Sequence, residues 1–146
     1  MNIAVFAGEA SGDAHAGALL RALKEIEPSL RSFGVGGDQM ALHGFEALRH
    51  ARDMGVGGFT EVVKNVPFYF RALHEMTEAV CRRLPDAVVL VDYPDFNILL
   101  GQAIHARLPE IPIIYFISPQ VWAWRKGRIR QIGAFARRVL VIFPFE

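Results

Sequence analysis

The sequence has almost no cysteine and no long apolar run. Its single cysteine, Cys81, cannot form an internal disulfide, and we interpret it as a structural thiol in a reducing compartment. No stretch reaches the roughly 18 consecutive apolar residues that a membrane-spanning helix needs. The first residues are patterned as a strand and lack the basic flank and apolar centre of a signal peptide. We therefore expect a cytoplasmic or membrane-peripheral protein.

Signals for metal and nucleic-acid binding are also scarce. The histidines show no His-x-x-x-His spacing and have no cysteine partners, so we predict no metal ion. A net charge of +1 gives no general attraction for nucleic acid. The chain contains no Gly-x-Ser-x-Gly elbow, which argues against a serine hydrolase of that kind.

What is present favours one α/β domain. The 146 residues are 52% hydrophobic and 21% charged, which excludes a disordered chain and is enough for a substantial core. Short apolar segments predict strands over residues 2–7, 31–35, 45–49, 87–91, 112–117 and 139–143. Because the last of these lies close to the final residue, we expect a first domain or a fragment.

Helical patterns alternate with these strands. They cover residues 13–27, 67–84, 95–108 and 120–135. Asp13 and Asp95 are the predicted N-caps of the first and third helices. Strands that alternate with helices of this length predict a Rossmann-like parallel sheet, flanked by helices and joined by right-handed crossovers.

The first strand is followed by a glycine-spaced turn, Gly8-Glu9-Ala10-Ser11-Gly12-Asp13. Ligands of open α/β sheets bind just beyond the carboxyl ends of the strands. The spacing matches neither the dinucleotide fingerprint nor the phosphate-loop consensus. Taken alone, it indicates an anion or a sugar near the start of a helix. Similar turns at residues 34–37 and 55–58 are explained equally well as ligand loops or as tight strand-to-helix turns.

Asp92 ends the fourth predicted strand and is a candidate general base at the same edge of the sheet. The alternative is a loop aspartate that binds nearby backbone N–H groups before Pro94. The pattern does not decide between the two. Asn97 falls in the first turn of the following helix, where it could cap the helix or bind a ligand.

The fifth strand is followed by a segment that carries both tryptophans and several cations. Gln120, Trp122, Trp124 and Arg125 are its candidate binding residues. Aromatic faces beside cations suit a sugar ring and a phosphate. They also suit single-stranded nucleic acid, for which one local patch is a weak argument. The tryptophans could instead belong to the core.

Apolar side chains gather around Pro67. They are Phe59, Val62, Val66, Phe68, Tyr69 and Phe70. If exposed together, they would form a membrane contact or a groove for acyl chains. If buried, they would be ordinary helix packing.

Several motifs occurring in order resemble the lipid-A-disaccharide synthase family. The most specific are residues 7–13, the run Asp92-Tyr93-Pro94-Asp95-Phe96-Asn97, and residues 118–125. The resemblance spans essentially the whole chain. It implies an inverting glycosyltransferase of the two-domain GT-B architecture, of which residues 1–146 would be the N-terminal, acceptor-side domain. The second domain, with most of the UDP site, would be absent, and this chain would be inactive alone.

The resemblance also implies a reaction and its participants. A 2,3-diacylglucosamine unit passes from its UDP conjugate to 2,3-diacylglucosamine 1-phosphate, giving a β(1→6) disaccharide of lipid A and releasing UDP. No cofactor or metal is implied. The enzyme would be peripheral on the cytoplasmic face of the inner membrane.

Carried onto this sequence, the resemblance implies that Asp92 is the catalytic base. Substrate contacts would come from the first motif, from Asn97 and from the tryptophan segment; their members are Gly8, Glu9, Ser11, Gly12, Asp13, Asn97, Gln120, Trp122, Trp124 and Arg125. It also favours acyl or membrane contact for the residues around Pro67.

Two other functions remain open at this stage. One is a non-catalytic module whose glycine loops hold a sugar phosphate or a nucleotide. The other is a related sugar-nucleotide epimerase, whose base would act on the sugar ring rather than on an acceptor hydroxyl.

Overall fold

The structure is a computed structural model that describes residues 1–54, 66–116 and 126–141. Its strands are β1 (Asn2–Ala7), β2 (Arg31–Gly36), β3 (Phe45–His50), β4 (Ala87–Val91), β5 (Ile113–Phe116) and β6 (Arg138–Leu140). Its helices are α1 (Ala10–Ile26), α2 (Asp38–Ala41), α3 (Ala51–Met54), α5 (Val66–Arg83), α6 (Pro94–Arg107) and α8 (Lys126–Gly133).

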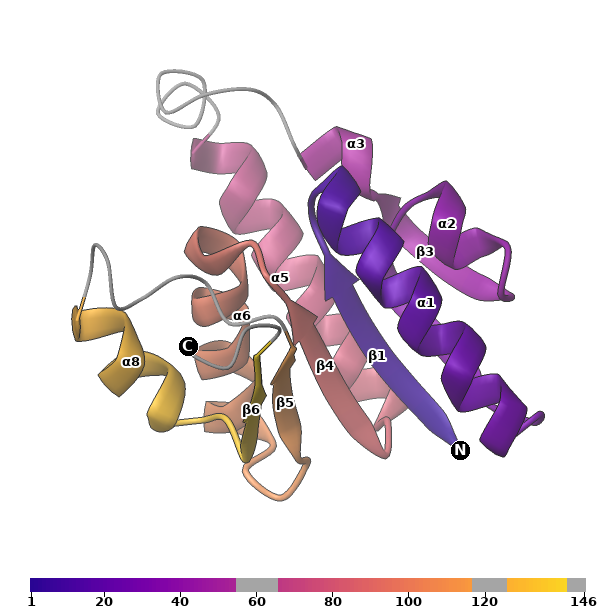
Figure 1. Ribbon diagram of the computed structural model, residues 1–146. Helices are drawn as coiled ribbons and strands as arrows, with labels where there is room; N and C mark the ends of the chain where they lie inside the picture. The colour runs from indigo at the N-terminus through magenta and orange to yellow at the C-terminus, as the bar shows by residue number, and fades with distance from the viewer. Residues whose placement is uncertain (55–65, 117–125, 142–146) are drawn as a thin grey trace.

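The strands form one parallel sheet in the order β3-β2-β1-β4-β5-β6 (Figure 1). This order confirms the predicted Rossmann-like sheet. The chain runs outward from β1 to β3 and then returns to the centre as β4, so the order reverses between β1 and β4. In an open α/β sheet, the crevice beyond the carboxyl ends of these two strands is the expected ligand site.

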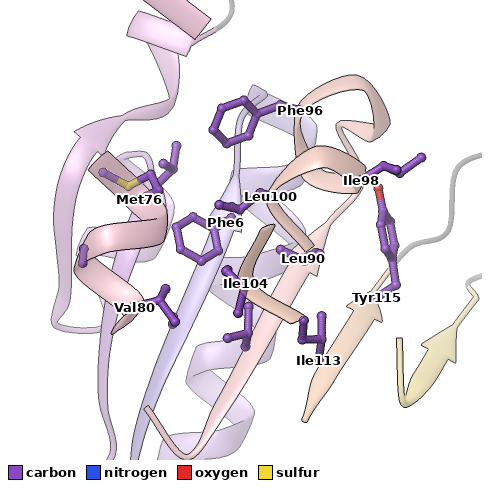
Figure 2. Packing of buried hydrophobic residues seen from close by; sticks show 14 of the residues in the cluster. Phe6, Met76, Val80, Leu90, Phe96, Ile98, Leu100, Ile104, Ile113 and Tyr115 are labelled. Atoms are coloured by element: carbon purple, nitrogen blue, oxygen red, sulfur yellow. The ribbon is translucent and has the colours of Figure 1, made fainter. Parts of the chain in front are cut away.

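Helices pack on both faces of the sheet, as parallel sheets require. Alternate residues of β1 enter different cores: Phe6 belongs to the core that includes residues of α5, α6 and α8, whereas Val5 belongs to the core that includes residues of α1. Figure 2 shows the first core, where Met76 and Val80 of α5 and Leu100 and Ile104 of α6 meet strand side chains such as Leu90. Between the two cores, strand pairing places the carboxyl ends of β1 and β4 side by side.

Most of the predicted elements are confirmed to within a few residues. The helix predicted over 120–135 is described from Lys126 as α8, and the glycine turn at 55–58 lies outside the described residues. The sequence patterns missed α2 and α3, which have four residues each. One turn of helix is too short to show a 3.6-residue periodicity.

Both predicted N-caps are wrong. Helix α1 begins at Ala10, with Glu9 as its N-cap, so Asp13 lies inside the helix and is only 6% exposed. Helix α6 begins at Pro94, with Tyr93 as its N-cap. Proline fits the first helical position because it has no N–H to satisfy there. In each case the sequence pattern placed the helix start too late.

Candidate active site

The candidate site is the edge of the sheet where β1 and β4 end. Gly8 and Glu9 follow β1, and Asp92 and Tyr93 follow β4. Strand pairing brings Ala7 opposite Val91, so the two turns leave the sheet at the same level. The topology therefore joins two motifs that lie more than eighty residues apart in the sequence.

The turn after β4 has an unusual backbone. Asp92 has a φ of 46° and Tyr93 a φ of 47°, so two successive non-glycine residues are left-handed. This conformation costs on the order of 1 kcal/mol or more for each residue and persists only where the surroundings enforce it. Backbone strain of this kind clusters at functional sites.

Asn97 provides part of that enforcement. Its Nδ2 donates to the carbonyl oxygen of Asp92 at 2.8 Å and lies 3.2 Å from those of Val91 and Phe6. The side chain is buried, with 1% of the residue exposed. The amide nitrogen is therefore engaged within the fold, and the ligand contact of Asn97 stays a prediction. Its amide ties the ends of β1 and β4 to the turn.

Tyr93 closes the turn over the first glycine motif. Its ring lies against Gly8, where a Cβ atom would overlap the ring carbons. Its hydroxyl, the hydroxyl of Tyr69 and the carbonyl of Met54 lie within 2.9–3.1 Å of one another. Burial, and then the hydrogen bond with Tyr69, raises the pKa of Tyr93, so the phenol stays protonated. Gly8 is thus required by packing, whether or not it also meets a ligand.

The carboxyl groups of the site influence one another. Glu9 lies near Asp92 and Asp95; desolvation is the largest cause that raises the pKa of Glu9, and the two negative charges raise it further. Asp95 pairs with Arg128 of α8, a role that replaces its predicted one as a cap. The site therefore concentrates negative charge at the amino-terminal ends of two helices, α1 and α6.

The remaining residues of the first motif have different surroundings. Ser11 is exposed in the first turn of α1, whereas Gly12 is buried, and a Cβ atom added there would lie 3.7 Å from the carbonyl oxygen of Val91. The Asp13 carboxylate accepts backbone N–H bonds from Gly37, Gln39 and Met40 at 2.8–3.1 Å. It therefore caps α2 from a neighbouring helix, and the substrate contact of Asp13 stays a prediction.

The tryptophan segment and the apolar patch are only partly described. Gln120, Trp122, Trp124, Arg125, Phe59 and Val62 lie outside the described residues. In the described part of the patch, Phe70 is 63% and Val66 43% exposed. Phe68 and Tyr69 instead pack against the core, and Arg49 lies over the Phe68 ring at 5.1 Å. The patch is thus exposed at two positions and half-buried at two others.

Tyr115 is the functional candidate that the sequence patterns missed. It lies on β5 and is 0% exposed, and its hydroxyl donates to the carbonyl oxygen of Asp92 at 2.9 Å. Figure 2 shows its hydroxyl directed toward the carboxyl ends of the strands. A signal was present in the sequence, because a tyrosine within a buried strand needs a partner for its hydroxyl.

Comparison with known proteins decides the family. The family model described as "Lipid-A-disaccharide synthetase" matches residues 3–146. The chain belongs to this family. It is 42% identical to a lipid-A-disaccharide synthase of Koribacter versatilis, over 100% of this chain and 38% of the relative. For the synthase of Myxococcus xanthus, the identity is 45%, over 99% of this chain and 37% of the relative. The chain thus spans less than two fifths of the length of these relatives.

The packing of the Tyr93 ring on Gly8 can be tested by adding a methyl group at position 8. Gly8→Ala should destabilise the fold by about 1–3 kcal/mol, because the new methyl group meets a ring held by its hydroxyl. Urea denaturation measures the loss. Gly127→Ala is the control, since a Cβ there meets nothing within 4 Å and alanine favours a helix. Equal stabilities for the two variants would contradict the packing.

The raised pKa of Glu9 predicts a pH-dependent effect of Glu9→Gln. Ionising Glu9 costs the folded state more than the unfolded chain, so wild type loses stability relative to the variant as pH rises from the ordinary 4.5 through the raised pKa. The melting temperature of the variant minus that of wild type should be higher at about pH 7 than at about pH 4, by about 1–2 °C.

Glu46→Gln is the matched control for this measurement. Hydrogen bonds from Arg83 lower the pKa of Glu46, so its stabilising contribution is lost as pH falls below the ordinary value. The melting-temperature difference for this variant should become more negative as pH rises. The same trend in Glu9→Gln would contradict a raised pKa for Glu9.

Proposed function

We propose that this chain is the acceptor-side domain of a glycosyltransferase of lipid A biosynthesis. The reaction transfers 2,3-diacylglucosamine from its UDP conjugate to 2,3-diacylglucosamine 1-phosphate and releases UDP. Family membership supports this activity. The main structural support for the proposal is the location of Asp92. This residue lies in a left-handed turn at the carboxyl end of β4, where the strand order reverses. We expect a second domain to bind most of the UDP, and residues 1–146 to be inactive alone.

In this proposal Asp92 is the general base. Its carboxylate takes the proton from the 6-hydroxyl of the acceptor while that oxygen attacks the anomeric carbon of the donor. The bond from that carbon to the UDP oxygen breaks on the opposite face, so UDP leaves with the electron pair and the configuration inverts. Hydrogen bonds to the backbone N–H and carbonyl of Asp92 fix the turn at the carboxyl end of β4, the edge of the sheet where a general base would be needed.

The first turn of α1 is the proposed place for a substrate phosphate or the developing negative charge. Ser11 is exposed there. The amino-terminal end of a helix offers unpaired N–H groups and a partial positive charge, both of which favour an anion. Glu9 has no hydrogen bond from its side chain to the helix end, so it does not occupy those donors.

The exposed apolar side chains of α5 are the proposed contact with the membrane or with acyl chains. None of the helices in the described ranges is long and apolar enough to cross a membrane. Substrates with acyl chains must nevertheless be reached from a bilayer. Val66 and Phe70 are exposed at the start of α5, and Arg71 beside them offers a positive charge. This surface favours peripheral binding to the cytoplasmic face of the inner membrane.

Asp92→Asn in the full-length protein tests the base. It should lower kcat by about 10²–10⁴-fold, the usual contribution of a general base. Asparagine tolerates the left-handed region well, so the melting temperature should hold. Formation of the disaccharide from UDP-diacylglucosamine and the acceptor phosphate measures the rate. Asp95→Asn, which removes a neighbouring carboxylate, should keep the rate within about threefold; a near-normal rate in Asp92→Asn would remove Asp92 from the role.

Phe70→Ser tests the membrane contact. Loss of a phenyl ring that would enter the bilayer should weaken binding to vesicles of phosphatidylethanolamine and phosphatidylglycerol by about 5- to 10-fold. Cosedimentation measures the binding. Leu42→Ser is the control, because Leu42 is 74% exposed at the end of α2, which packs with the other core. Equal losses in both variants would assign the binding to general hydrophobicity rather than to α5.

A further inference from the structure

The turn at Asp92 needs a source of stability that its own sequence does not supply. Neither Asp92 nor Tyr93 is a glycine, and both are left-handed. Each conformation is disfavoured by the side chain itself. Because no residue in the turn relieves this strain, the surrounding contacts must hold the backbone in place.

Those contacts converge on the peptide groups of Asp92. Its N–H donates to the carbonyl oxygen of Phe116 at 3.1 Å. Its carbonyl oxygen accepts from Asn97 Nδ2 at 2.8 Å and from the Tyr115 hydroxyl at 2.9 Å. A carbonyl oxygen has two lone pairs, so these two donors satisfy it completely. The orientation of the residue is therefore set from α6 and from β5 at once.

Tyr115 brings a hydroxyl donor into the apolar core, where a phenylalanine would satisfy packing equally well. The residue is 0% exposed, lies opposite Leu90 in the sheet and belongs to the main core. Burial is the largest cause that raises the pKa of Tyr115, followed by the negative charge of Asp92, so its hydroxyl keeps its proton. The hydroxyl thus remains a hydrogen-bond donor over any pH at which the protein is active.

We infer that Tyr115 is a positioning residue for Asp92: its hydroxyl, acting through the Asp92 carbonyl, sets the direction of the carboxylate. The inference rests on the proposed function, because it assigns Tyr115 a role in the reaction that Asp92 would catalyse. Small errors in the position of a reacting group are costly, and displacement of about 1 Å can lower a rate by about 10²-fold. Tyr115 itself is buried, so its proposed role requires no contact with either substrate.

The test is Tyr115→Phe in the full-length protein, measured as disaccharide formation over a range of acceptor concentrations. The ring stays in the core and one of the two donors to the carbonyl is lost. We expect kcat to fall by about 5- to 10-fold while KM stays within about twofold. Thr77→Val is the control, since it removes another buried hydroxyl, which donates to the Leu73 carbonyl at 2.7 Å within α5. It should leave kcat unchanged.

A double variant separates positioning from stability. If Tyr115 acts through the Asp92 carboxylate, Tyr115→Phe should cost nothing further once Asp92→Asn is present. A kcat near wild type in Tyr115→Phe, an equal loss in Thr77→Val, or additive losses in the double variant would overturn the inference. Full activity in Asp92→Asn would instead overturn the proposed function, so the two failures give different results.

Discussion

The left-handed turn that follows β4 is the constraint on which the candidate site depends. Its two residues adopt backbone angles that their side chains disfavour, and contacts from the surrounding elements keep them there. Asn97 of α6 and Tyr115 of β5 donate hydrogen bonds to the turn, and Phe116 of β5 accepts one from it. After β1, Gly8 has no side chain, so the Tyr93 ring can pack against its backbone. The tyrosine hydroxyls attach the same turn to the end of α3. The conformation of the turn therefore depends on several contacts together, and these contacts come from the whole edge of the sheet.

The same arrangement explains why buried polar groups appear in a core that is otherwise apolar. The Asn97 amide and the Tyr115 hydroxyl each donate to backbone carbonyls at the ends of strands, where the ladder of sheet hydrogen bonds stops. Asp13 performs the corresponding task at the start of α2, whose N–H groups would otherwise lack partners. A buried polar group is tolerated when its hydrogen bonds are made, and Asn97 meets this condition only through Nδ2, because its Oδ1 is buried without a partner among the described residues. Here these bonds also join elements that are distant in the sequence.

Much of the fold could be predicted because its signals are local. Short apolar runs showed the strands, and apolar residues at helical spacing showed the three long helices. The alternation of the two indicated a parallel sheet. The helix starts were placed too late because Asp13 and Asp95 are good caps in general, and nothing in the local sequence shows that another element uses Asp13 or that Arg128 pairs with Asp95. The four-residue helices α2 and α3 carry no periodic pattern at all.

The candidate site was less predictable. The sequence singled out Asp92, Gly8 and Glu9, and the strand order places them at one edge of the sheet. It could not show that Asn97 faces inward, that Tyr115 binds the Asp92 carbonyl, or that Phe68 and Phe70 differ in exposure. Hydrophobic periodicity depends only on residues close together in the sequence. The order of strands and helices along the chain, and their apolar faces, therefore follow from the sequence alone. Partners of a buried donor lie tens of residues away, and the packed tertiary structure alone determines which carbonyl each donor meets.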